Sequence, residues 1–120
     1  MEENNLKILK PIVFKTSLGF VYFDYNDIIM CSADGNCTSV FTLENESPLK
    51  ILHNISFVER KYCNEKFIRC HKSHIINLTH IEKLIIKSHQ VQLKRNFIVP
   101  LSESCWKKIK QVSDMNIHEI

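Results

Sequence analysis

A run of side chains suited to contacts with nucleic acid lies between residues 69 and 73. Arg69, His71, Lys72 and Ser73 supply cationic and hydroxyl donors within five residues, and such donors bind phosphate oxygens and base edges. In a strand, Phe67, Arg69 and His71 would share one face, and neither face would be purely apolar. This mixture is typical of a strand that leaves the core and presents its last residues to a ligand. An isolated run of this kind is more often a solvated turn, so the surrounding pattern decides between the two readings.

The same part of the chain carries most of the basic excess. Residues 1–65 hold six Lys/Arg against nine Asp/Glu, residues 66–95 hold seven against one, and residues 96–120 hold three against three. Four histidines lie in the middle window, namely His71, His74, His80 and His89. A concentrated basic excess is typical of a surface that neutralises phosphates, although a solvated basic face without a ligand would give the same pattern.

Length and composition indicate a single globular domain. A chain of 120 residues buries about two-thirds of its unfolded surface around one core, and 44% hydrophobic with 24% charged residues is typical of an ordered protein. No run approaches the ~18 apolar residues of a membrane helix, and the acidic start followed by Lys7, Lys10 and Pro11 is unlike a signal peptide. Five scattered cysteines favour reduced thiols over a disulfide framework. We therefore expect a cytoplasmic protein without a membrane segment.

Short apolar runs separated by turn residues predict a mainly β fold. Asp34-Gly35 is a strong hairpin-turn dipeptide, and Ser17-Leu18-Gly19 marks a second hairpin. We expect strands at 12–15, 20–23, 27–33, 37–43, 49–52, 67–70, 74–76, 81–86, 91–93 and 97–99. Residues 1–10 are predicted to be a polar lead-in, residues 11–116 one domain and residues 117–120 a tail.

Two segments have helical rather than strand spacing. Apolar residues at positions 55, 58 and 62 predict a short helix with Asn54 or Ser56 as its N-cap, and Ser56 with Glu59 matches a capping box. After Ser102, a second predicted N-cap, Trp106 and the apolar residues at 109 and 112 predict an amphipathic C-terminal helix.

The sequence offers little for catalysis. With two glycines in the whole chain, no phosphate-cradling loop of the dinucleotide or P-loop type is present. Ser73 is next to His74 and Cys70 is next to His71, but neighbours on a strand point to opposite faces, so neither pair forms a nucleophile and its base. We therefore expect a protein that is not an enzyme and has no small-molecule substrate and no cofactor.

A metal site is a stronger alternative to nucleic-acid binding than catalysis is. Cys63, Cys70, His71, His74 and His80 are all zinc-ligand types within eighteen residues, but no C-x2-C pair precedes the histidines in the usual zinc-motif arrangement. We expect no metal. The Cys70 thiol suggests a further hypothesis, that its oxidation would add bulk beside Lys72 and so weaken binding.

The run that begins at Phe67 resembles the signature of the LytTR family of bacterial DNA-binding domains. In that signature a phenylalanine, an arginine, a His-Arg-Ser run and an Ile-Val-Asn run precede an isoleucine-rich strand. The corresponding residues here are Phe67, Arg69, His71-Lys72-Ser73, Ile75-Ile76-Asn77 and Ile81. The similarity extends over residues 27–112, because the Asp-Gly hairpin, the internal helix and the Val-Pro-Leu-Ser run at 99–102 follow in the family's order.

The resemblance implies a LytTR-like elongated arrangement of small antiparallel β-sheets with one short internal helix and a C-terminal helix. It also implies that three segments contact double-stranded DNA. The matching positions are Asn36 and Thr38 in the hairpin, then Arg69, His71, Lys72 and Ser73 in the main segment, and Ser102 at the start of the last helix.

Two positions depart from the family pattern. Lys72 stands where arginine is usual, and lysine lacks the planar fork that binds guanine O6 and N7 together. Glu103 stands where the family commonly has arginine, and a carboxylate would be repelled by phosphate. The third contact would then be shortened or moved to Lys107 and Lys108.

The expected function is therefore sequence-specific binding of double-stranded DNA by a non-catalytic bacterial transcription regulator of the LytTR type. Such domains serve as output domains of response regulators, and this chain has no room for a receiver. A homodimer on repeated half-sites would suit its small size. The alternative is a protein–protein interaction module in which strand edges and the Trp106 helix bind a partner and the basic face is incidental.

Overall fold

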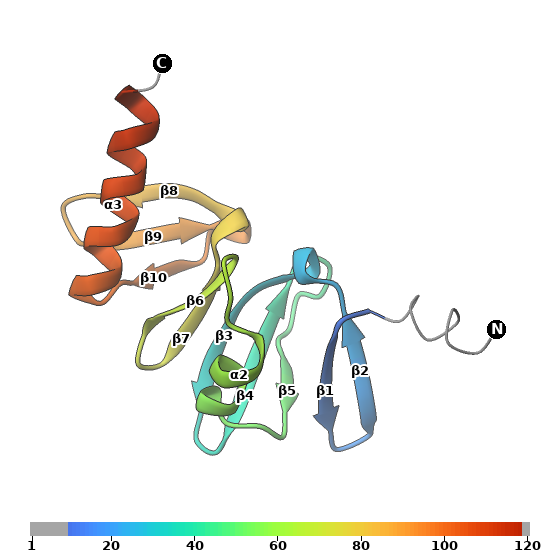
Figure 1. Cartoon of the computed structure of the whole chain (residues 1–120). Helices are drawn as coiled ribbons and strands as arrows, with labels where there is room; N and C mark the ends of the chain where they lie inside the picture. The colour runs from blue at the N-terminus through green and yellow to red at the C-terminus, as the bar shows by residue number, and fades with distance from the viewer. Residues whose placement is uncertain (1–9, 119–120) are drawn as a thin grey trace.

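The structure, a computed structural model, describes residues 10–118. It contains three antiparallel sheets and two α-helices in an elongated arrangement (Figure 1). The strands are β1 (Ile12–Thr16), β2 (Gly19–Phe23), β3 (Ile28–Asp34), β4 (Cys37–Thr42), β5 (Leu49–Ile51), β6 (Phe67–His71), β7 (His74–Asn77), β8 (Ile81–Ile85), β9 (Gln90–Leu93) and β10 (Ile98–Pro100). The helices are α2 (Ile55–Tyr62) and α3 (Glu103–His118). The predicted mainly β fold is confirmed.

A five-stranded sheet in the order β5-β4-β3-β7-β6 forms the centre of the molecule. The β1-β2 hairpin lies beside β5, because the Leu52 amide donates to the Lys15 carbonyl at 2.8 Å. The three strands β10-β9-β8 form a separate sheet, which α3 packs against (Figure 1).

Two apolar cores lie on opposite faces of the central sheet. One packs α2 and the β1-β2 hairpin against the sheet through residues such as Phe14, Val58 and Ile75. The other packs α3 and the β8–β10 sheet through residues such as Ile76 and Trp106. Neighbouring residues of β7 thus enter different cores, as the alternation of side chains along a strand requires.

Asn77, a residue of the family signature, has a structural role. Its side chain is fully buried, and its amide donates to the carbonyls of Tyr25 and Ile28 at 2.9 Å each. Its side-chain oxygen accepts from the Thr79 amide at 3.0 Å. Asn77 therefore ties β7 to the turn that precedes β3, and these bonds satisfy polar groups that burial would otherwise leave unpaired.

Helix α2 has one of the two predicted caps. The Asn54 side chain accepts from the Phe57 amide at 2.8 Å, whereas Ser56 lies inside the helix. The predicted capping box between Ser56 and Glu59 is therefore wrong, because both side chains bond to Arg69 instead. The cap of α3 is confirmed, since the Ser102 hydroxyl accepts from the Cys105 amide at 3.3 Å.

The structure also shows features that the sequence patterns did not predict. Short turns of helix occur at Tyr25–Asp27, Leu78–His80 and Lys94–Asn96. Helix α3 runs through residue 118, so the predicted domain end at residue 116 falls inside a helix. Most of the predicted lead-in and the last two residues of the predicted tail lie outside the described residues. Between residues 10 and 118, no helix is long and apolar enough to span a membrane.

Candidate nucleic-acid interface

The three predicted contact segments lie close together at one end of the central sheet. Strands β3 and β7 pair antiparallel, with Ser32 opposite His74, and the Ala33 amide donates to the Ser73 carbonyl at 2.8 Å. The β3-β4 and β6-β7 turns are therefore neighbours. The start of α3 joins them, because the Ser102 amide donates to the Cys70 carbonyl at 2.7 Å. Both turns point toward the lower side of Figure 1.

Lys72 is the exposed cation of the β6-β7 turn. It follows a bulge in β6, where the register shifts between Arg69 and His71. The Ser73 amide donates to His71 Nδ1 at 3.2 Å, which fixes the ring against the turn. With Glu59, Arg69, His71 and Ser102, Lys72 lines an open hollow of about 180 Å³. The cationic side chains of Arg69 and Lys72 and the hydroxyl of Ser102 thus line one space large enough for a phosphate group.

Arg69 is held by other parts of the protein. Its Nη1 donates to Glu59 Oε1 at 2.9 Å and to Ser56 Oγ at 3.2 Å, and its Nη2 donates to the Lys72 carbonyl at 2.5 Å. The side chain is only 22% exposed. Most of the donor fork is therefore used inside the molecule, and Arg69 shapes the turn that presents Lys72.

The β3-β4 turn exposes one predicted contact and buries the other. Gly35 adopts a φ of +61°, the left-handed conformation that suits glycine in a two-residue hairpin turn, and Asn36 beside it is exposed. Thr38 is fully buried, and its hydroxyl donates to the His53 carbonyl at 2.7 Å. The prediction that Thr38 contacts DNA is therefore wrong, because its side chain points into the protein.

The start of α3 has a neighbour that the sequence did not predict. His89, in the β8-β9 turn, stacks on Trp106 with ring centroids 4.0 Å apart, and its Nδ1 lies 3.5 Å from Glu103 Oε2. This stacking brings the turn that contains the exposed Lys87 beside the Ser102 end of α3. Lys87 is therefore an additional candidate cation on the turn beside the start of α3, and no motif marked it.

Two histidines pack together beside the Lys72 turn. The rings of His71 and His74 are 5.4 Å apart, and His74 Nδ1 shares a 2.9 Å hydrogen bond with the Ser32 hydroxyl. Burial, with a smaller contribution from His71, lowers the pKa of His74 below its usual value. His74 is therefore neutral at pH 7 and acts as a hydrogen-bonded support of the turn. Among residues 10–118, no three His, Cys, Asp or Glu side chains gather closely enough to hold a metal ion.

The basic window of the sequence does not form one patch in space. Arg95 donates to the backbone carbonyls of Thr42, Asn45 and Glu46, at the end of β4 away from Asn36. Lys66 precedes β6 and so lies at the other end of that strand from Lys72. The concentration of charge in residues 66–95 therefore overstates the number of cations at the interface.

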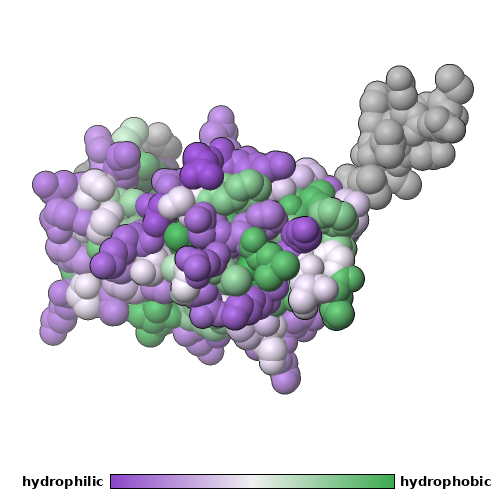
Figure 2. Space-filling view, turned by 90° about the horizontal axis from the view of Figure 1, so that it is seen from below, coloured by the Kyte–Doolittle hydropathy of each residue, from purple (hydrophilic) through white to green (hydrophobic). Residues whose placement is uncertain are grey.

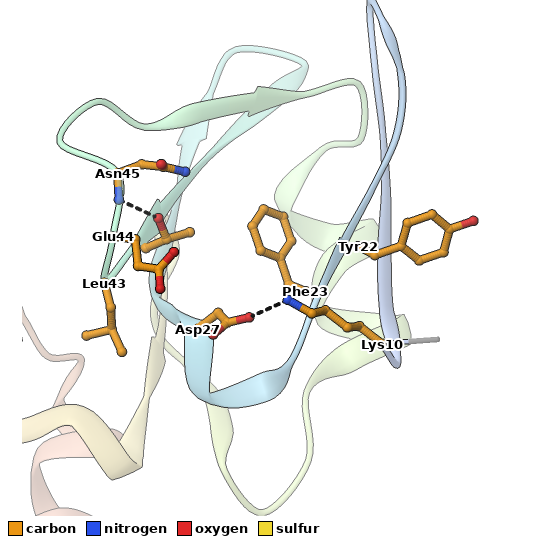
Figure 3. Close-up of a pocket in the computed structure, with 8 residues that line it drawn as sticks. Lys10, Tyr22, Phe23, Asp27, Leu43, Glu44 and Asn45 are labelled. Atoms are coloured by element: carbon orange, nitrogen blue, oxygen red, sulfur yellow. Dashed lines mark hydrogen bonds and ion pairs between the residues drawn. The ribbon is translucent and has the colours of Figure 1, made fainter. Parts of the chain in front are cut away.

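A hollow on another side of the molecule has a different character. It encloses about 120 Å³ and is lined by residues near the start of β3 and the end of β4 (Figure 3). Lys10 Nζ lies 3.4 Å from Asp27 Oδ2 across it, and Glu44 adds a second carboxylate to the lining. Its one lysine is already paired, so this hollow is unsuited to a phosphate.

The surface seen from the side of the two turns is mainly hydrophilic, with small and separate apolar groups (Figure 2). A broad apolar contact area is not visible on this face. Such a surface suits a polar and hydrated partner better than an apolar one.

Comparisons with known proteins agree with this geometry. The LytTr DNA-binding domain family matches residues 19–114 of the chain. Among solved structures, the chain is similar to the LytTr DNA-binding domain of a Bacillus cereus protein described as a methyl-accepting/DNA response regulator, with a TM-score of 0.65 and 23% identity over 83% of this chain and 93% of that one. At this identity the similarity supports the fold. The comparison with curated proteins found no match.

Proposed function

Because the chain belongs to the LytTr DNA-binding domain family, and such domains bind DNA, we propose that it is a sequence-specific, non-catalytic regulator of transcription in the bacterial cytoplasm. Its target is double-stranded DNA. The observation that carries the proposal is the convergence of the Asn36 turn, the Lys72 turn and the Ser102 end of α3 at one end of the central sheet.

The contacts divide by chemistry. Lys72, Ser102 and Lys87 are suited to phosphates, because they supply cationic or hydroxyl donors without a fixed direction of readout. Asn36 and His71 are suited to base edges, because amide and imidazole groups donate and accept at defined positions. Ser73, in the same turn as Lys72, has a hydroxyl that can donate to a phosphate or to a base edge. Affinity that rests on cations should fall steeply as salt rises.

We also propose that two copies bind repeated half-sites. One domain presents two short turns and one helix end, which offers few base contacts. A second copy on the same duplex would add affinity through effective concentration. The alternative, a protein-binding module built on the Trp106 helix, loses its main anchor, because Trp106 is only 7% exposed and stacks on His89.

The test of the proposal compares two lysine variants on a duplex recovered by selection from random sequences. Lys72→Ala should weaken binding by about 1–3 kcal/mol and reduce the slope of log affinity against log salt by about one. Lys66→Ala is the matched control, since it removes the same charge roughly 20 Å away along β6, at about 3.3 Å per residue. Equal affinities for wild type and Lys72→Ala would contradict the assignment.

A further inference from the structure

Helix α2 is joined to the DNA-facing turn by a single guanidinium group. Arg69, on β6, donates from Nη1 to Glu59 and Ser56 of α2 and from Nη2 to the Lys72 carbonyl. Because the guanidinium is planar and rigid, fixing one of its arms fixes the direction of the other. The backbone of the turn therefore depends on two side chains of a helix that contributes none of the proposed base contacts.

We propose that Glu59 is a positioning residue for DNA binding, which holds Arg69 so that Arg69 in turn holds the Lys72 turn. This inference rests on the proposed function. The 2.9 Å ion pair between Glu59 and Arg69 is the shortest bond from the guanidinium to α2. Arg69 Nε is buried and has no hydrogen-bond partner, so burial and the α2 bonds leave the group little freedom to turn toward a ligand.

The positioning role predicts that removal of the Glu59 carboxylate changes DNA affinity in the direction opposite to the one that simple electrostatics predicts. Glu59 lines the same hollow as Lys72 and Ser102, so its negative charge repels a phosphate there. If charge alone mattered, removing the carboxylate would strengthen DNA binding. If Glu59 acts by positioning Arg69, removing it frees the turn and weakens DNA binding, because the ordering of Lys72 must then be achieved during association.

The experiment uses two carboxylates on the same side of the molecule. Glu59→Ala should weaken duplex binding about tenfold, from the loss of one hydrogen bond between charged groups. Glu59→Gln should fall between Glu59→Ala and wild type, because its amide oxygen still accepts from Arg69. Glu103→Ala, which removes the exposed carboxylate at the start of α3, should bind DNA more tightly than wild type. Thermal unfolding confirms that each variant is folded at the temperature of the titration.

Coupling with Lys72 separates positioning from a general loss of stability. In a Lys72→Ala background the Glu59→Ala loss should become smaller, since the turn then presents no lysine, whereas the Glu103→Ala effect should persist. Glu59→Ala binding at least as tightly as wild type, or losing as much affinity with Lys72 absent, would overturn the inference.

A measurement made without DNA tests the role of Glu59 independently of the proposed function. Hydrogen exchange of the Ser73 amide, which donates to His71 Nδ1, and of the Ala33 amide, which donates to the Ser73 carbonyl, should be faster in Glu59→Ala than in wild type, while amides of the β8–β10 sheet exchange equally in both. Unchanged exchange at the turn would overturn the inference. Failure of the wild-type protein to bind any duplex, with faster exchange in Glu59→Ala, would contradict the proposed function and leave the role of Glu59 in ordering the turn intact.

Discussion

At the scale of single residues, equal charges have unequal roles. Lys72 and Arg69 are three positions apart, but Lys72 is exposed while Arg69 bonds to Glu59, Ser56 and the Lys72 carbonyl. The difference follows from their side chains, because the arginine fork satisfies several acceptors at once and the lysine ammonium is a flexible point charge. The sequence motif places Arg69 on β6 and Lys72 in the turn that follows it, but it contains nothing that distinguishes a contact residue from its support.

The cysteines also differ by burial. Burial, with a smaller contribution from Cys105, raises the pKa of Cys70 to about 12, and its Sγ contacts the carbonyls of His74 and Pro100. A thiol reacts with oxidants as the thiolate, so at pH 7.5 mild peroxide should leave Cys70 reduced. Cys37, half-exposed beside the β3-β4 turn, should oxidise first.

Mass spectrometry of peptides from the folded protein checks this order, with the denatured protein as the control in which all five thiols react. Rapid oxidation of Cys70 in the folded state, accompanied by loss of DNA binding, would contradict this prediction. It would support the hypothesis that oxidation of Cys70 weakens DNA binding.

At the scale of secondary-structure elements, neighbouring turns are supported from inside the sheet. Thr38 illustrates this support, since its buried hydroxyl ties β4 to the segment that leads into α2. Thr38→Val should lower the free energy of unfolding by about 1–3 kcal/mol, because the His53 carbonyl loses its donor. DNA affinity should stay at the wild-type value wherever the variant is folded.

Denaturant unfolding and a duplex titration of the same preparation measure the two quantities, and Lys66→Ala serves as the neutral control for stability. A Thr38→Val protein with wild-type stability and weakened, less selective DNA binding would instead indicate that Thr38 contacts DNA.

The elements differ in how far the sequence predicted them. The strands were predicted because alternation and turn residues such as Gly35 are local signals. The roles of Ser56 and Glu59 were not, because a capping box is also local, while their true partner Arg69 is ten or more residues away and across a loop. Burial of Thr38 and the stacking of His89 on Trp106 at the start of α3 likewise depend on tertiary packing.

At the scale of the whole molecule, an elongated body suits a duplex. The domain measures 49 × 36 × 26 Å, and one turn of B-form DNA extends about 34 Å along its axis. The three sheets and α3 are arranged along this length (Figure 1), and the Asn36 turn, the Lys72 turn and the start of α3 lie close together at one end of the central sheet. Because the β3-β4 and β6-β7 turns are short and are joined to paired strands, the central sheet holds them in place.

Sequence-specific DNA binding is tested by selection from a pool of random duplexes by the purified protein at two salt concentrations, with sequencing of the retained DNA. We expect a recurring motif, repeated at a spacing near one helical turn, and affinity that falls steeply as salt rises. Salt-sensitive retention without a motif would contradict sequence-specific binding. Absence of retention at both salts would contradict DNA binding altogether.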